Sequence, residues 1–179
     1  MNADYQSILI AGYGGQGILF AGKVIAYAGL IDEKEVSWLP SYGPEMRGGS
    51  ANCTVCLSNE IIASPYVQYP EYFLAMNQLA FNKYISTVEK GGVVIYDSAI
   101  IDGKTDRKDL TIYGIDAVSL AEKSGAQGLS NMVMTGRLYK ELMFCSYASL
   151  EKAVEKCVPE SKVQLIEWNL KAIQLGIES

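Results

Sequence analysis

The sequence predicts a layered α/β domain, because short apolar runs alternate with longer segments of helical spacing. Residues 7–11 and residues 93–96 are almost wholly apolar, and a glycine or a polar pair ends each run, as expected of strands that are buried on both faces of a sheet. With 179 residues, of which 49% are hydrophobic, the chain is long enough for one sizeable core and short for two. We therefore expect a single domain over residues 1–179.

The first helix should follow the first strand directly, from Gly17 to about Leu30. Its apolar residues lie on every side of a helical projection, so a second layer or a partner subunit should cover the side that faces away from the sheet. Further strands are expected at residues 36–39, 51–57, 72–76 and 111–113. Further helices are expected at residues 77–88 (capped by Asn77), 116–123, 131–144, 149–158 and 161–175.

Local turn signals set the expected ends of several elements. Pro40 should end the second strand, and residues 58–60 have the composition of a tight turn that makes a local hairpin with residues 61–62. Ser161 and Gln164 form a capping-box pattern at the start of the last helix. The expected architecture is therefore a mixed, largely parallel sheet followed by a C-terminal helical segment.

The clearest candidate site is the glycine-rich turn after the first strand. Residues 12–17, Gly-Tyr-Gly-Gly-Gln-Gly, fit G-x-G-x-x-G between a strand and a helix, the context in which this pattern indicates a Rossmann-like phosphate-binding turn. Glycines let the backbone approach a ligand closely, and the N–H groups and positive end of the helix attract an anion. The pattern predicts either an anion site or close packing of the helix against the sheet or another chain.

Binding of NAD or FAD would need one more feature, an acid at the end of the second strand that holds a ribose hydroxyl. That strand should end at Leu39 and Pro40. Three acids, Asp32, Glu33 and Glu35, come before the strand, where they have the character of solvated turn residues. A free-standing nucleotide-binding enzyme of Rossmann type is therefore the alternative hypothesis.

Residues 41–50 form a second loop that contains glycine and proline, and Arg47 is its only basic residue. A lone arginine on a loop is most often solvated. A guanidinium beside glycines such as Gly48 can also hold a phosphate or carboxylate through two parallel hydrogen bonds. The residues alone leave both interpretations open.

Charge and composition exclude several classes of function. The chain has 15 basic and 20 acidic residues, a net charge of −5 and no run of lysine or arginine, so nucleic acid and anionic membranes are not expected partners. It contains no histidine, which excludes Ser-His-Asp and Cys-His catalysis and the commonest zinc ligand. No basic leader and no uninterrupted apolar span is evident, so we expect a cytoplasmic protein.

The four cysteines are expected to be thiols that pack in the core in a reducing compartment. Cys53 and Cys56 form a C-x-x-C pattern, but they lie on an expected strand, where residues three apart point to opposite faces. Cys145 and Cys157 lie within or beside helical patterns. No second pair is present to complete a zinc site.

Four other residues lie at positions for which a role can be predicted. Asp97, with Ser98, comes at the carboxyl end of a buried strand, where an acid can hold a ligand or cap the next turn. Asn131 and Gly136 lie at the start and middle of an expected helix. We expect them to serve packing and assign them no chemistry.

Three segments together carry a family resemblance. Gly-Gly-Gln-Gly at residues 14–17, Ser-Tyr-Gly-Pro-Glu-Met-Arg-Gly-Gly-Ser-Ala-Asn-Cys at residues 41–53 and Ser-Pro at residues 64–65 closely resemble the gamma subunit, or gamma domain, of 2-oxoacid:ferredoxin oxidoreductases. The likeness covers most of residues 6–145, and Pro-Glu-Met-Arg-Gly-Gly is more similar to the 2-oxoglutarate branch than to the pyruvate branch. The resemblance implies the fold of domain III of pyruvate:ferredoxin oxidoreductase.

The resemblance also implies an enzyme complex of which this chain is one subunit. Such complexes oxidatively decarboxylate a 2-oxoacid on magnesium-bound thiamine diphosphate, pass electrons through 4Fe-4S clusters to ferredoxin, and release an acyl-coenzyme A. Alpha, beta and ferredoxin-like delta subunits would be the partners. This sequence has no Gly-Asp-Gly with a downstream asparagine and no four-cysteine cluster motif. We therefore assign it no cofactor, metal ligand or catalytic residue of its own, and expect the isolated chain to be inactive.

The two loops are the expected places of contact with coenzyme A phosphates or with a partner subunit. The candidate residues are Gly14, Gly15, Gln16, Gly17, Arg47 and Gly48. A scaffold that binds no small molecule is also compatible with these residues.

Overall fold

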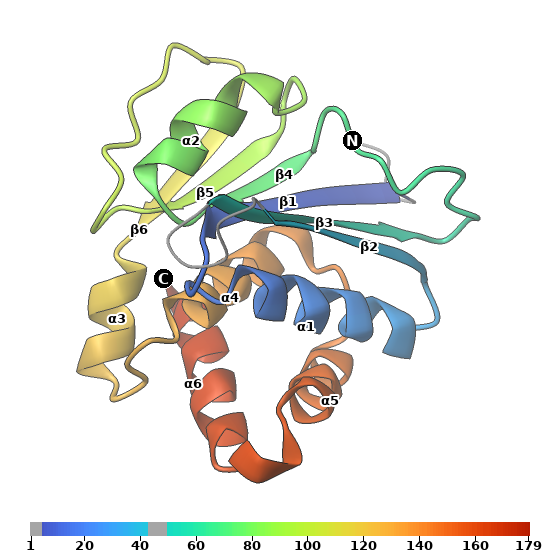
Figure 1. Ribbon diagram of the computed structural model, residues 1–179, viewed down its shortest axis with the longest axis vertical. Helices are drawn as coiled ribbons and strands as arrows, with labels where there is room; N and C mark the ends of the chain where they lie inside the picture. Colours follow the sequence, from blue (N-terminus) through green and yellow to red (C-terminus); the bar gives the residue numbers. More distant parts are fainter. Residues whose placement is uncertain (1–4, 43–49) are drawn as a thin grey trace.

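A computed structural model describes residues 5–42 and 50–179, within which a six-stranded sheet has the order β2-β3-β1-β4-β5-β6 (Figure 1). The strands are β1 (Tyr5–Tyr13), β2 (Glu35–Tyr42), β3 (Ser50–Ser58), β4 (Tyr72–Ala75), β5 (Val93–Asp97) and β6 (Thr111–Ile115). The α-helices are α1 (Ile18–Ile31), α2 (Gln78–Tyr84), α3 (Ala117–Lys123), α4 (Ser130–Leu142), α5 (Tyr147–Cys157) and α6 (Leu165–Glu178). Two short 3-10 turns are η1 (Ile85–Thr87) and η2 (Glu160–Lys162). The predicted α/β class with a mixed sheet is confirmed.

The strand β1 lies at the centre of the sheet because both of its faces are apolar. Ile8 and Ile10 are fully buried in a large core on one face, and Leu9 and Ala11 are buried in a smaller core on the other. On one side β1 pairs in parallel with β4, and on the other it pairs antiparallel with β3 along its whole length. The strands β4, β5 and β6 continue in parallel.

Helices cover the two faces of the sheet unequally. The helix α2 lies on one face, whereas α1 and the C-terminal helices lie on the other (Figure 1). The outer side of α1, which we expected a second layer or a partner to cover, packs mainly against α5 of the same chain. Within the described ranges no helix combines the length and the apolar character needed to cross a membrane.

The edge strand β2 continues through Pro40, so the prediction that this proline ends the strand is wrong. Pro40 lies opposite Cys53 in an antiparallel ladder with β3. A proline is tolerated there because β2 has a neighbour on one side only, and the missing N–H group need not leave a ladder bond unmade.

The predicted local hairpin with residues 61–62 is also wrong. Those residues lie outside any strand, and the side chain of Ile61 is 87% exposed. The hairpin partner of β3 is β2 instead. The sheet is mixed, as predicted, for this different reason.

Because β3 runs antiparallel to both β1 and β2, these two strands point the same way. Tyr13 at the end of β1 lies opposite Ser50, and Tyr42 at the end of β2 lies opposite Ala51. The carboxyl ends of β1 and β2 therefore lie at the same end of the sheet, as expected for the first two strands.

Helix starts were predicted with mixed success. Asn77 caps α2 as predicted, since its Oδ1 accepts a hydrogen bond of 2.7 Å from the N–H of Ala80. The capping box of Ser161 and Gln164 is wrong. Pro159 accepts a bond from the N–H of Lys162 in a separate 3-10 turn, and α6 begins only after Gln164, without a side-chain cap.

Two glycines let α4 and α6 approach each other closely. A Cβ atom at Gly136 would overlap the carbonyl oxygen of Ile173, and one at Gly176 would overlap that of Val133. The expectation that Gly136 serves packing is therefore confirmed. Asn131, at the start of α4, is 4% exposed.

Asp32 ties the end of α1 to the start of α5. Its Oδ2 accepts a bond of 2.6 Å from the N–H of Ser146, and its Oδ1 accepts bonds from the hydroxyls of Ser146 and Ser149. Burial opposes ionisation of this carboxyl, but the hydrogen bonds from Ser149 and Ser146 outweigh it and hold its pKa below the ordinary value. The carboxylate thus stabilises the packing of α5 on α1.

We predict that Asp32→Asn lowers the free energy of unfolding by about 2 kcal/mol at pH 7, since an amide puts a donor where three donors already converge. The pKa is lowered by folding, so the contribution is complete above the unfolded value of about 3.9 and is lost as pH falls through the folded value. Urea unfolding of both proteins from pH 7 to pH 3 measures this.

The exposed Asp106 offers a matched control, because Asp106→Asn removes the same charge without a structural tie. A difference between wild type and Asp32→Asn that persists unchanged at pH 3 would contradict the role of Asp32.

Candidate functional site

The glycine turn joins the end of β1 to the start of α1. Gly15 and Gly17 have φ angles of 101° and 73°, in the left-handed region that favours glycine. Gly17 is the N-cap residue of α1, and within the described residues no side-chain hydrogen bond caps this helix. The first N–H groups of a helix have no acceptor within the helix, so this end of α1 can receive an anion.

The side chain of Gln16 holds the turn against the ends of β1 and β4. Its Oε1 accepts a bond of 2.7 Å from the N–H of Tyr13, and its Nε2 donates a bond of 2.6 Å to the carbonyl of Met76. The amide of Asn77 donates to the same Oε1 at 3.4 Å. A Cβ atom at Gly12 would overlap Gln16, so that glycine is needed for the arrangement.

Asn131 supports the turn from α4, a role that the sequence analysis missed. Its Nδ2 donates a bond of 3.1 Å to the carbonyl of Gly17. A Cβ atom at Gly17 would overlap this amide. The sequence shows an asparagine at the expected start of a helix, but nothing in it connects this residue to a turn 114 residues earlier.

Two hollows flank the turn and share Gly15, Gly17 and Phe20. One has a volume of about 320 Å³ and is lined by Tyr13, Gly14, Gly15, Gly17, Ile18, Leu19, Phe20 and Ala51. The other, of about 330 Å³, extends to the segment between α5 and α6, which contributes Lys162, and to α6, which contributes Asn169. A Cβ atom at Gly15 would meet nothing within 4 Å. In the part of the chain that the structure describes, the surface beside the start of α1 is therefore hollowed and not filled by side chains.

Four of the six predicted site residues thus lie together at the start of α1. Gly14, Gly15 and Gly17 line the hollows, whereas the amide of Gln16 is engaged within the chain. Arg47 and Gly48 lie outside the described residues.

The geometry removes the basis for the dinucleotide alternative. A dinucleotide fold places its second strand parallel and next to the first, but here β3 lies between β1 and β2. The parallel neighbour of β1 is β4, which is followed by Met76 and Asn77 rather than by an acid. Asp32 accepts a hydrogen bond from Ser146 at the start of α5. Glu35 begins β2, so it lies at the end of the sheet opposite to the glycine turn.

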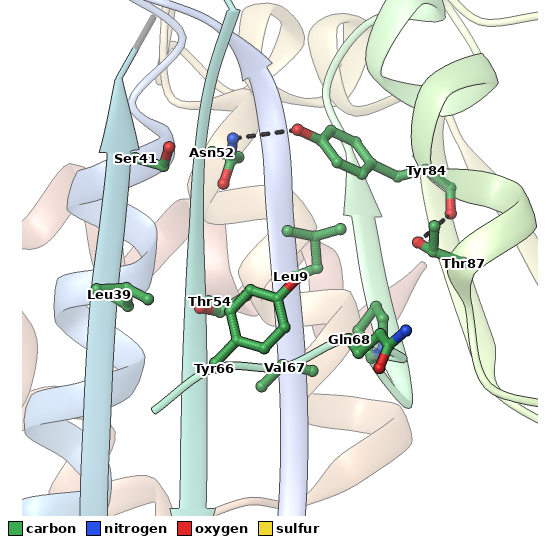
Figure 2. A pocket seen from close by; sticks show the side chains of 11 residues that line it. Leu9, Leu39, Ser41, Asn52, Thr54, Tyr66, Val67, Gln68, Tyr84 and Thr87 are labelled. Atoms are coloured by element: carbon green, nitrogen blue, oxygen red, sulfur yellow. Dashed lines mark hydrogen bonds between the residues drawn. The ribbon is translucent and has the colours of Figure 1, made fainter. Parts of the chain in front are cut away.

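A further cavity of about 330 Å³ lies over β1, β3 and β2, on the face that α1 does not cover (Figure 2). Its floor includes Leu9, Leu39 and Thr54, and the hydroxyl of Tyr84 accepts a bond of 3.1 Å from Asn52 at one end. The residues that line it are all uncharged. It therefore offers no cation for an anionic ligand.

Asp97 is 1% exposed and serves the turn that follows β5. Its Oδ1 accepts a bond of 3.1 Å from the N–H of Ala99. Burial raises the pKa of this carboxyl above the ordinary value. Of the two roles considered for Asp97, capping of the next turn is the one that the contacts support.

All four cysteines are buried thiols, as predicted. Cys53 faces α1 and donates a bond of 3.6 Å to the carbonyl of Ile18, whereas Cys56 accepts a bond of 3.3 Å from the hydroxyl of Tyr5. Burial raises the pKa of Cys53 and of Cys145 to about 12.

The fold and the site define an α/β chain with a glycine turn suited to an anion or to a partner surface, and without the strand order of dinucleotide-binding enzymes. The chain belongs to the family of pyruvate ferredoxin/flavodoxin oxidoreductases, whose model matches residues 7–179. This agrees with the resemblance carried by the two loops.

Individual relatives differ in how much of their length the chain covers. The 2-oxoglutarate synthase subunit KorC of Methanocaldococcus jannaschii is 36% identical over 176 residues, which are 97% of this chain and 92% of that protein. The ketoisovalerate oxidoreductase subunit VorA of Methanothermobacter marburgensis is 33% identical over 172 residues, which are 96% of this chain but 36% of that protein. The chain therefore spans about a third of the length of the VorA relatives.

Among solved structures, the gamma subunit of a keto/oxoacid ferredoxin oxidoreductase from Geobacter sulfurreducens superposes with a TM-score of 0.82 and 30% sequence identity. The match covers 97% of this chain and 96% of that one. The similarity therefore extends over nearly the whole of both chains.

We predict that the native chain reacts slowly with a thiol reagent at pH 8, because burial and a raised pKa keep the thiols from ionising. In denaturant, four thiols should react at the rate of a model thiol. Ellman's reagent, with and without guanidinium chloride, measures both. Rapid native labelling of Cys53, or a disulfide between Cys53 and Cys56 under mild oxidation, would contradict the packing role.

Proposed function

We propose that this chain is the gamma subunit of a 2-oxoacid:ferredoxin oxidoreductase whose substrate is 2-oxoglutarate. The observation that carries the proposal is the match to KorC over nearly the whole of both chains, in a family of oxidoreductases. The complex would decarboxylate the 2-oxoacid oxidatively, reduce ferredoxin and form an acyl-coenzyme A. Alpha, beta and ferredoxin-like delta subunits would be the partners, and the cytoplasm the compartment.

In this proposal the chain has a binding and packing role, and the thiamine diphosphate, magnesium and 4Fe-4S clusters belong to the partners. In the part of the chain that the structure describes, no three side chains of His, Cys, Asp or Glu gather where they could hold a metal ion. The four thiols are separately buried, which does not fit the ligation of a cluster. We therefore derive no chemical step through these groups.

The chain's own contribution would be to receive coenzyme A at the edge where β1 and β2 end. Coenzyme A carries several phosphates, and the uncapped start of α1 favours negative charge. The larger flanking hollow combines Lys162 with the apolar side chains of Phe20, Leu129 and Leu165. In the described residues the buried Oδ1 of Asn169 at this hollow has no hydrogen-bond donor, which a ligand with N–H groups could supply. Arg47 would add a guanidinium from the second loop.

The proposal predicts that the tagged chain, purified without oxygen from its own cells, brings with it subunits that bind thiamine diphosphate and iron–sulfur clusters. The eluate should reduce a viologen dye when both 2-oxoglutarate and coenzyme A are added. Mass spectrometry and a panel of 2-oxoacids measure this. A chain that elutes alone and binds NADH or FAD tightly in calorimetry would instead support the nucleotide-binding enzyme.

The same preparation tests the role of Arg47. Arg47→Ala should raise the coenzyme A concentration for half-maximal rate roughly tenfold, the size of one charge-assisted contact. Lys104→Ala is the matched control, because the Lys104 side chain is 87% exposed and forms a long ion pair of 3.9 Å with Asp102. An unchanged coenzyme A dependence in Arg47→Ala would reject the contact while leaving the subunit assignment intact.

A further inference from the structure

The side chain of Gln16, in the glycine turn, takes part in three hydrogen bonds within the chain. It accepts from the N–H of Tyr13 at 2.7 Å and donates to the carbonyl of Met76 at 2.6 Å. Met76 in turn donates its own N–H to the carbonyl of Ala11 at 2.8 Å. One side chain therefore joins the turn to the carboxyl ends of two parallel strands.

An amide is the group that this position requires. The N–H of Tyr13 needs an acceptor and the carbonyl of Met76 needs a donor, so the two backbone groups also fix which end of the Gln16 amide is oxygen. A carboxylate has no donor for the carbonyl, and an apolar side chain satisfies neither group. The shorter side chain of asparagine lacks one methylene of reach.

The Gln16 amide also belongs to a wider set of amides around the turn. Asn77 donates to Gln16 at 3.4 Å and accepts from Ala80 at the start of α2. Asn131 donates to Gly17 at 3.1 Å from α4. The turn is thus held from the β4–α2 junction on one side and from α4 on the other.

We infer that Gln16 is a positioning residue, which fixes the glycine turn and the start of α1 for coenzyme A and does not bind the ligand itself. This inference rests on the proposed function. The Gln16 amide is bonded to Tyr13 and Met76 and lines neither of the two hollows, whereas the backbone N–H groups at the start of α1 are the ones that need an acceptor. Rigid support of these groups lowers the cost of ordering them when the ligand binds.

The test uses the assembled complex with Gln16→Met, which keeps the length of the side chain, adds no charge and removes the hydrogen bonds. We expect the KM for coenzyme A to rise roughly tenfold, the effect of losing one to two such bonds. The kcat and the KM for 2-oxoglutarate should stay within about twofold of wild type. Hydrogen exchange at the Tyr13 amide of the variant should be faster than in wild type.

Gln174→Met is the matched control, because Gln174 is exposed on α6 and its side chain donates to Glu178 on the same helix. An unchanged KM for coenzyme A in Gln16→Met, or a raised KM without faster exchange at Tyr13, would overturn the inference. Failure of both Gln16→Met and Gln16→Ala to enter the complex would also overturn it, since the role would then be structural. A wild-type complex without coenzyme A-dependent activity would instead reject the proposed function.

Discussion

The rest of the structure depends on the antiparallel pairing of β3 with β1 along the full length of both strands. The ladder makes β1 a central strand, and its two apolar faces are then buried in separate cores. It also leaves β2 as an edge strand, in which Pro40 is tolerated. Above all, it brings the carboxyl ends of β1 and β2 to the same end of the sheet.

Because of the same ladder, the glycine turn has different structural neighbours from those that its sequence pattern predicts. In a dinucleotide fold, the turn works with an acid at the end of an adjacent parallel strand. Here that neighbour is β4, and the two residues after its end, Met76 and Asn77, are hydrogen-bonded to the Gln16 amide of the turn. The side-chain support of the turn comes from Gln16 and Asn131.

Local patterns were enough to predict most elements but not their neighbours. The apolar runs of β1 and β5 and the helix after Gly17 depend on nearby residues, and they were predicted close to their observed bounds. The passage of β2 through Pro40 depends on its place at the sheet edge, which no local signal gives. The late start of α6 depends on the separate turn at Pro159, and the capping-box pattern was misleading there.

The candidate site was predicted in part for the same reason. The glycines at residues 14–17 stand out in the sequence because their conformations are local, with positive φ at Gly15 and Gly17. The Gln16 side chain donates a hydrogen bond to Met76, sixty residues later. The Asn131 side chain donates one to Gly17, which requires contact between α4 and the turn. Such pairings arise from the packing of the sheet and could not be predicted from spacing.

We propose that the end of the sheet at which β1 and β2 finish faces coenzyme A and the partner subunits. Hydrogen exchange read by mass spectrometry, on the isolated chain and on the assembled complex with and without coenzyme A, tests it most directly. The account predicts slower exchange over residues 13–20 on assembly, and slower still with coenzyme A. Unchanged exchange over residues 13–20 in all three states, with protection confined to other surfaces, would contradict it.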